Sequence, residues 1–211
     1  MSVSRETGAS GVGTPPEAPA YFGDQWATAQ RYAELLATWG VERGMIGPRE
    51  VPRLWERHLL NCAAVCPRLP DGATVADVGT GAGLPGLVWA IARPDVSMTL
   101  VEPLLRRVRF LTAVVDDLDL TNVEIVRSRA EDHDRRYEVV TARAVASLDK
   151  LMTWCWPLVA EGGVLLAMKG QSATDEVKAS QPSLKRLEVK DVRIESYGDL
   201  AVPTTVVEIT R

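Results

Sequence analysis

Several features that would place this chain of 211 residues in a broad class are missing. Three unevenly spaced cysteines are too few for a disulfide framework and fit a reducing compartment, so we expect a cytoplasmic protein. No apolar run is long enough to cross a membrane, because the longest, residues 84–92, contains Pro85 and Gly86. The first residues also lack the apolar segment of a signal peptide. These absences argue against a secreted disulfide-rich protein and against a membrane protein.

An excess of positive charge is missing too, since the formal net charge is −4. Nothing global therefore indicates nucleic-acid binding, and an RNA partner would need a local basic surface. The apolar fraction of 46% is ample for a hydrophobic core. We expect a flexible tail (1–23) rich in glycine, serine and proline, then an N-terminal helical extension (24–70) and one α/β domain (71–211).

Beyond residue 70 the hydrophobic pattern alternates between strand and helix periods. Five strands are expected at residues 74–78, 96–101, 123–126, 138–142 and 164–168, most of them separated by helices. Strands that alternate with helices pair in parallel through right-handed crossovers. Two final strands, 187–197 and 204–210, have no helix between them, which predicts an antiparallel pair at the end of the sheet.

The chain is organised around residues 75–86, which read VADVGTGAGLPG. A strand, a glycine-rich turn and a helix start form the usual cradle of a nucleotide cofactor, because glycines let the backbone approach a ligand and a helix start offers free N–H groups. The spacing fits two classes. From Gly81 it matches the dinucleotide pattern G-x-G-x-x-G, and from Asp77 it matches D-x-G-x-G-x-G of S-adenosylmethionine-dependent methyltransferases. The antiparallel ending favours the second class.

Four charged side chains lie at or just after the carboxyl ends of expected strands, where open α/β sheets bind ligands. Asp77 either meets a cationic cofactor or stabilises the turn, and Glu102 either accepts hydrogen bonds from a ribose or caps the next helix. Glu131 either contacts an adenine or is solvated. Arg143 either contacts a cofactor or phosphate, or forms a salt bridge with a nearby acid.

Other possible sites are weaker. His58, Cys62 and Cys66 share one helical face, but a zinc site needs a fourth ligand, so core packing is the better interpretation and no metal is expected. His133 has no nucleophile motif near it, which leaves a hydrolase triad unsupported. A set of arginines forms either an RNA-facing patch or an ordinary solvated surface: Arg106, Arg107, Arg109, Arg127, Arg129, Arg135 and Arg136.

Several segments together resemble one family, the bacterial 16S ribosomal RNA guanine-N7 methyltransferases, also called the glucose-inhibited division protein B family. The resemblance spans about residues 24–170 and rests on Arg-His-Leu-Leu at 57–60, the glycine loop with its Leu-Pro-Gly ending at 84–86, Glu102 with Arg-Val-Arg-Phe-Leu at 107–111, Arg-Ala-Glu at 129–131, Thr-Ala-Arg-Ala at 141–144 and Met-Lys-Gly at 168–170. The chain departs from the family at Leu84, where Phe is common, and at Asn61, where Asp is common.

The resemblance implies an α/β class I S-adenosylmethionine-dependent methyltransferase (Rossmann-like) fold, with a mostly parallel seven-stranded sheet, an antiparallel C-terminal strand and N-terminal helices. It implies a guanine in the 530 loop of 16S RNA as substrate, as naked RNA or in the small ribosomal subunit. The expected cofactor-binding residues, from motif and resemblance together, are Asp77, Gly79, Gly81, Leu84, Glu102, Ala130, Glu131 and Arg143.

The N7 atom of guanine has a lone pair and no proton, so no general base is expected and proximity would provide most of the catalysis. Arg143 and Lys169 are candidates for positioning, and Arg57, His58, Arg106 and Arg107 for RNA binding. We expect a monomer that binds neither membrane nor metal. Two alternatives remain open at this point: an NAD(P)-dependent oxidoreductase and a non-catalytic RNA-binding module.

Overall fold

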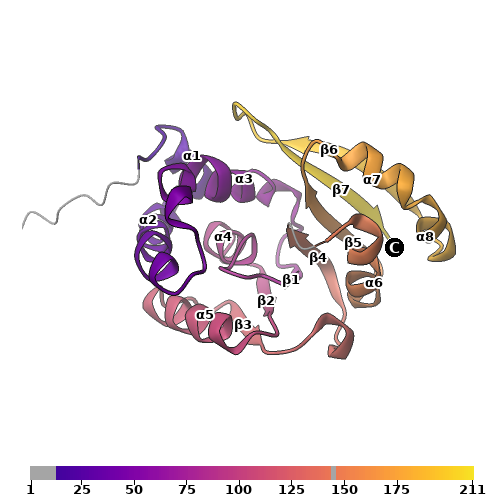
Figure 1. Cartoon of the computed structure of the whole chain (residues 1–211), viewed down its shortest axis with the longest axis horizontal. Helices are drawn as coiled ribbons and strands as arrows, with labels where there is room; N and C mark the ends of the chain where they lie inside the picture. The colour runs from indigo at the N-terminus through magenta and orange to yellow at the C-terminus, as the bar shows by residue number, and fades with distance from the viewer. Residues whose placement is uncertain (1–12, 144–145) are drawn as a thin grey trace, which may run out of the picture.

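A computed structural model describes residues 13–143 and 146–211, and within them one sheet of seven strands has the order β3-β2-β1-β4-β5-β7-β6 (Figure 1). Strands β1 to β5 pair in parallel, while β7 pairs antiparallel with both β5 and β6. The strands are β1 (Thr74–Val78), β2 (Ser97–Val101), β3 (Val123–Val126), β4 (Tyr137–Arg143), β5 (Val159–Lys169), β6 (Asp191–Tyr197) and β7 (Thr204–Thr210). The predicted mostly parallel sheet and its antiparallel ending are confirmed.

Helices cover both faces of this sheet, and each face has its own hydrophobic cluster (Figure 1). One cluster contains side chains of α1 (Ala18–Phe22), α2 (Trp26–Leu35), α3 (Leu60–Ala63), α4 (Gly86–Ala92) and α5 (Leu105–Asp117). The other contains side chains of α6 (Leu148–Cys155), α7 (Ala173–Ala179) and α8 (Gln181–Arg186). The N-terminal helices therefore share a core with the sheet.

Side chains of the central strands alternate between these two clusters. In β1, Val75 packs with α1–α5 and Ala76 packs with α6–α8, and Val139 and Val140 of β4 divide in the same way. This follows from the period of two in a strand, which sends successive side chains to opposite faces. Because both faces are covered by helices, β1, β2 and β4 are buried along most of their length.

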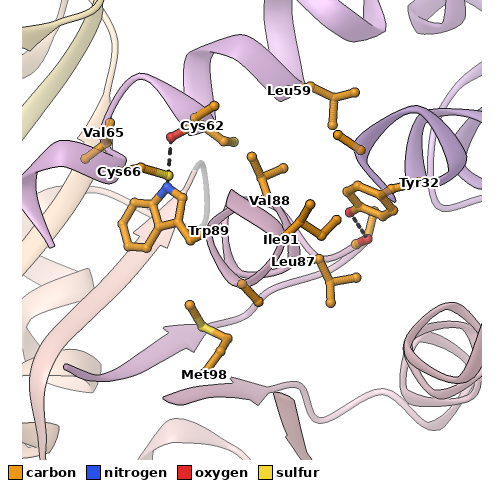
Figure 2. Close-up of a cluster of buried hydrophobic side chains, with 14 of the residues drawn as sticks. Tyr32, Leu59, Cys62, Val65, Cys66, Leu87, Val88, Trp89, Ile91 and Met98 are labelled. Atoms are coloured by element: carbon orange, nitrogen blue, oxygen red, sulfur yellow. Dashed lines mark hydrogen bonds between the residues drawn. The ribbon is translucent and has the colours of Figure 1, made fainter. Parts of the chain in front are cut away.

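Trp89 of α4 belongs to the larger cluster, where it is fully buried (Figure 2). Its indole Nε1 donates a hydrogen bond of 2.8 Å to the carbonyl oxygen of Cys62, and so links α4 to α3. At the other end of α4 in Figure 2, the hydroxyl of Tyr32 donates a hydrogen bond of 2.8 Å to the carbonyl oxygen of Ala82. The N-terminal helices thus support the glycine loop through the hydrogen bond from Tyr32 to Ala82.

The structure corrects several boundaries. The expected tail (1–23) is structured at its end, because Ala18 and Phe22 of α1 are buried, while residues 1–12 lie outside the described residues. Helices α7 and α8 were not expected from the sequence. Strand β5 begins before the expected strand 164–168 and contains a bulge, where Gly162 has a φ of +75°.

Candidate active site

The glycines after β1 serve two different purposes. Gly79 and Gly81 have φ values of +70° and +61°, which only glycine adopts at little cost, and both line a cavity. Gly83 and Gly86 are required by packing instead: a Cβ on Gly83 would lie 2.4 Å from Leu87 Cδ1, and one on Gly86 would lie 2.4 Å from Leu100 Cδ2. The loop therefore presents its first two glycines to a ligand and buries the last two.

Asp77 lies behind this loop rather than in the cavity. Its side chain is fully buried, and its Oδ2 accepts a hydrogen bond of 2.8 Å from the backbone N–H of Gly86, the first residue of α4. The expected free N–H group at that helix start is thus already bonded within the protein. Burial raises the pKa of Asp77 to about 6, and its Oδ1 has no hydrogen-bond partner among the described residues. The loop-stabilising interpretation of Asp77 accounts for these contacts.

Glu102 fixes the loops at the end of β2. Its carboxylate accepts hydrogen bonds of 3.1 Å from Gly81 N and 3.0 Å from Leu104 N, and Arg107 Nη1 lies 3.4 Å from Oε2. The side chain is 1% exposed. An ionised carboxylate offers about four acceptor positions, so one remains after these three donors. Glu102 thus ties the glycine loop to the start of α5 and retains capacity for one further donor.

A mostly apolar cavity of about 280 Å³ lies beside Gly79, between the ends of β1 and β2 and helix α6. Its lining includes Leu104 and Trp154, together with Ala130 and Glu131 of the short helix η6 (Ala130–Asp132). We call it the adenosine-side cavity, because a flat apolar slot with a few polar groups at its edge suits a purine ring.

A second cavity, of about 400 Å³, lies on the other side of Gly79, which lines both. We call it the loop-side cavity, and its lining consists of Met45, Ile46, His58, Gly79, Thr80, Gly81, Ala82, Leu84, Arg107 and Arg143. The two cavities together have the size of a site for a nucleoside-containing cofactor. Glu102 lines neither cavity and lies behind Gly81, from whose backbone N–H it accepts a hydrogen bond.

An open cleft of about 570 Å³ adjoins the loop-side cavity. It is lined by Arg57, His58, Asn61, Arg143, Ala146, Met168, Lys169, Gly170, Gln171, Glu176, Val202, Pro203, Thr204 and Thr205. These residues come from the N-terminal helices, from the ends of β4 and β5 and residues just after them, from α7, and from the hairpin between β6 and β7 with the start of β7. His58 and Arg143 line both the cleft and the loop-side cavity, so they form the boundary between them.

Comparison with known proteins identifies the family. Residues 25–201 match the family model described as rRNA small subunit methyltransferase G (GidB). A Salinispora tropica protein named ribosomal RNA small subunit methyltransferase G is 52% identical over 219 residues, which cover 97% of this chain and 90% of the relative. A Corynebacterium glutamicum protein of the same name is 46% identical over 217 residues, covering 100% of this chain and 97% of the relative.

The chain belongs to the rRNA small subunit methyltransferase G family. Solved structures agree on the fold: an S-adenosylmethionine-dependent methyltransferase from Aquifex aeolicus has a TM-score of 0.58 at 16% identity, covering 82% of this chain and 97% of that chain. TYW2 from M. jannaschii, solved with AdoMet, has a TM-score of 0.59 at 14% identity, covering 74% and 77%. The predicted class I methyltransferase fold is confirmed, and membership of this family removes the oxidoreductase alternative.

For a methyltransferase of this family, the predicted cofactor residues fall into two groups. Those that line the two cavities are Gly79, Gly81, Leu84, Ala130, Glu131 and Arg143. Asp77 and Glu102 are buried behind the loop, where they hold the backbone that lines the cavities. The substitution at Leu84 is apolar for apolar, in a cavity that Met45 and Ile46 also line.

The arginines predicted to bind RNA are not one patch. Arg57 is exposed at the cleft, with 52% of its side chain accessible, and Arg106 is exposed at the start of α5. Arg107 differs from the expectation, because it lines the loop-side cavity and pairs with Glu102. His58 is half-buried, and both of its ring nitrogens have partners within the protein. Of these four residues, Arg57 has the most direct access to the cleft.

Lys169 lies in the cleft lining, but its ammonium group is already paired. Its Nζ donates 2.6 Å to the carbonyl oxygen of Ala146 and lies 2.8 Å from Glu176 Oε2, and only 6% of its side chain is exposed. Glu176 Oε2 also accepts a hydrogen bond of 2.8 Å from Leu148 N. Lys169 therefore holds Ala146 and, through Glu176, the start of α6, rather than projecting into the cleft.

Sequence reasoning missed Trp154 and Tyr32. Trp154 lies off the apolar face of α6 formed by Leu148, Leu151, Met152 and Cys155, and a large aromatic side chain in that position was the available signal. Tyr32 had no signal, since its contact with the glycine loop is 50 residues away in sequence. In the described part of the chain, no group of three or more His, Cys, Asp or Glu side chains is arranged to hold a metal, and no helix is long and apolar enough to span a membrane.

Proposed function

We propose that this protein transfers the methyl group of S-adenosylmethionine to N7 of a guanine in the 530 loop of 16S ribosomal RNA. Membership of the family supports the substrate class, and the resemblance noted from the sequence supports the atom and the loop. The observation that carries the proposal is the shared boundary: His58 and Arg143 line both the loop-side cavity and the open cleft, so groups held in the two spaces are direct neighbours.

The residues fit the cofactor in three places. The adenosine-side cavity would hold the adenine between Leu104 and Trp154, with Ala130 and Glu131 at its edge. Glu102 would use its remaining acceptor position for a ribose hydroxyl.

The loop-side cavity would hold the amino-acid end of the cofactor. There the backbone of Gly79 and Gly81 can approach the ligand closely, and the guanidinium of Arg143 supplies positive charge for the carboxylate. Among the described residues Arg143 has no salt bridge to an acidic side chain, although it lies close to the buried Asp77.

Bound S-adenosylmethionine supplies an electrophilic methyl group on a positively charged sulfur. Transfer would break the carbon–sulfur bond as the bond to N7 forms, with the positive charge passing from the sulfur to the guanine. Because N7 bears no proton, the protein has only to align the two groups and exclude water. The cleft lining fits a reaction without a general base, because Lys169 and Glu176 are paired with each other and neither is placed as a free base.

RNA would enter the cleft from the side where Arg57 and Val202 are exposed, and Val202 is 71% exposed. An apolar side chain beside an arginine suits a splayed base and its phosphate. The helical extension (24–70), which carries Arg57, would form one wall of this cleft, and the α/β domain (71–211) the other. We further propose that the protein acts as a monomer in the cytoplasm, where its ribosomal substrate is found.

The decisive experiment incubates the protein with methyl-labelled cofactor and small ribosomal subunits that lack the modification. We expect label in 7-methylguanosine within the 530 loop, and parallel reactions with naked 16S RNA separate the two substrate forms. RNA containing 7-deazaguanosine at the target is the matched control, because a carbon replaces N7 and no transfer is possible. Label at another guanine atom would overturn the N7 assignment, and RNA binding without any label would favour the non-catalytic module.

A further inference from the structure

A chain of three polar side chains crosses the boundary between the loop-side cavity and the cleft. Arg143 Nη2 lies 2.7 Å from His58 Nδ1, and His58 Nε2 lies 2.9 Å from Glu50 Oε2. Arg143 stands at the end of β4, while His58 and Glu50 belong to the N-terminal helices, in η4 (Trp55–Leu59) and η3 (Pro48–Arg53). The chain therefore joins the two walls of the proposed site.

The protonation state of His58 follows from its two partners. A guanidinium has donors and no acceptor, so Nδ1 must accept the hydrogen bond from Arg143. The Nε2 atom then carries the proton and donates a hydrogen bond to the carboxylate of Glu50. His58 is thus neutral in this arrangement, and burial, together with the charge of Arg143, lowers its pKa.

Three further hydrogen bonds from the two Nη atoms of Arg143 go to neutral acceptors on η4 and on α3, which follows it. Nη2 donates 3.1 Å to the carbonyl oxygen of Arg57, and Nη1 donates 3.5 Å to the carbonyl oxygen of His58 and 3.1 Å to Cys62 Sγ. Segment η4 is π-helical, a geometry that widens the turn and occurs often at functional sites. The guanidinium is therefore held in place without neutralisation by a carboxylate in the described part of the chain, which leaves its charge available to an anionic ligand.

We propose that His58, neutral and protonated at Nε2, is a positioning residue that aims Arg143 at the carboxylate of the cofactor. This inference rests on the proposed function, in which Arg143 contacts the amino-acid end of S-adenosylmethionine. Protonation of His58 at Nδ1 replaces the acceptor with a donor and sets a second positive charge beside the guanidinium. Arg143 then loses its hydrogen-bond acceptor on His58, and the affinity for the cofactor falls as the pH falls.

Other charged groups around His58 set the pH at which this happens. Glu50 favours the protonated form, whereas Arg57 on the same element and Arg143 on β4 oppose it. Cys62 of α3 is buried, which raises the pKa of its thiol and keeps it neutral. Arg107 lines the loop-side cavity, and Lys169 and Glu176 line the cleft as a pair. With the pKa of His58 lowered, the affinity loss should occur below its ordinary value of about 6.5.

Two amide variants separate the roles of the two ring nitrogens. In His58→Asn the short amide can offer an oxygen acceptor where Nδ1 lies, so Arg143 keeps its anchor. In His58→Gln the longer amide reaches towards Glu50 and leaves Arg143 without that acceptor. Calorimetric titration of the full chain with S-adenosylhomocysteine, across acid to neutral pH, measures the result directly. Thermal unfolding of each variant checks that it is folded.

At neutral pH we expect Kd to stay within about threefold in His58→Asn and to weaken by about tenfold in His58→Gln, the usual effect of losing one hydrogen bond to a charged group. The acid loss of affinity should disappear in both variants. In Glu50→Gln it should move to lower pH, because the carboxylate that favours protonated His58 is gone. Glu50→Gln therefore still tests the role of His58 if both His58 variants fail to fold.

Unchanged affinity in His58→Gln, or an acid loss that persists in His58→Asn, would overturn the role of His58. An unshifted acid loss in Glu50→Gln would do the same. The ligand's own ionisations are common to all the proteins and cancel in the comparison. Because binding is measured without RNA, a failure of methyl transfer does not affect the result, whereas a wild-type protein that binds no cofactor would overturn the proposed function itself.

Discussion

At the scale of single residues, glycines with the same backbone conformation have different surroundings. Gly83 has a φ of +99°, and a Cβ there would lie 2.7 Å from Leu87 Cγ and 2.8 Å from the Tyr32 hydroxyl. Gly162 has a φ of +75° and nothing within 4 Å of the corresponding position. Comparison of Gly83 with Gly162 therefore separates the free-energy cost of a positive φ from the cost of a crowded Cβ.

Gly83→Ala is expected to lower the free energy of unfolding by about 2–4 kcal/mol, because strain and overpacking add. It should also weaken S-adenosylmethionine binding, since the loop must shift. Gly162→Ala carries only the conformational cost, about 1 kcal/mol, and lies away from both cavities. Urea unfolding and calorimetry measure the two effects. Equal destabilisation in both variants would show that crowding at Gly83 is relieved without cost.

Asp77 provides a pH-dependent prediction. Its folded pKa of about 6 lies above the ordinary value of about 3.9, so the folded state holds the proton more tightly than the unfolded state does. Stability from this group is therefore complete below about pH 4 and declines as pH rises to about 6, by about 2–3 kcal/mol. Asp77→Asn keeps an acceptor for Gly86 N and does not titrate. Urea unfolding of both proteins across this range should show the wild type losing stability relative to the variant, and a constant difference would contradict the assignment.

At the scale of elements, the N-terminal helices act as a support for the glycine loop and for the boundary of the cleft. The hydroxyl of Tyr32 in α2 donates a hydrogen bond to the carbonyl oxygen of Ala82. Arg31, one residue earlier, forms a bidentate salt bridge with Asp117 of α5, with N–O distances of 2.8 and 2.9 Å. Arg143 makes the third link, from β4 to η4. The helical extension is thus held at three points, and two of its partners, Ala82 and Arg143, line the loop-side cavity.

Tyr32→Phe removes one of these links and retains the ring. Ala82 O then loses its buried partner, which should cost about 1–2 kcal/mol of stability and weaken cofactor affinity by about threefold to tenfold. Tyr21→Phe is the matched control, because that hydroxyl is half-buried and has no hydrogen bond in the part of the chain described here. Calorimetry and thermal unfolding report both effects, and equal behaviour of the two variants would argue against support of the loop by α2.

At the scale of the whole molecule, a net charge of −4 requires that RNA be bound by a local surface rather than by a general positive field. Arg57 is exposed at the cleft and lies 3.5 Å from Glu50. Arg193 also forms a salt bridge, with Asp191 at 2.6 Å. It belongs to the outer strand β6, near the end of that strand that is far from the cleft. These two arginines match in charge and pairing but differ in place.

Arg57→Gln is expected to weaken binding of 16S RNA or small subunits and to reduce the slope of log affinity against log salt by about 1, as one phosphate contact is lost. Arg193→Gln should leave both unchanged. Equilibrium binding at several salt concentrations measures the slope. A slope that falls equally in both variants would indicate diffuse attraction and remove the cleft as the RNA surface.

The sequence by itself determined the class of sheet and the strand that carries the glycine loop. Strand β1 was predicted at its observed bounds and β3 and β7 likewise, because buried strands with clear turns leave a local pattern. The helices α7 and α8 were missed, and so was the bulge at Gly162, because tertiary packing rather than local pattern decides such features.

Only the tertiary structure decided what each charged side chain does. Asp77 faces the N–H of Gly86, Lys169 faces Glu176, and Arg143 meets His58 across 85 positions of sequence. The pairing of Arg143 with His58 depends on how β4 and the N-terminal helices come together, and no local propensity encodes a contact at that separation. The sequence therefore located the strand ends that border the cavities, while the fold decided which side chains line those cavities and which ones hold the backbone around them.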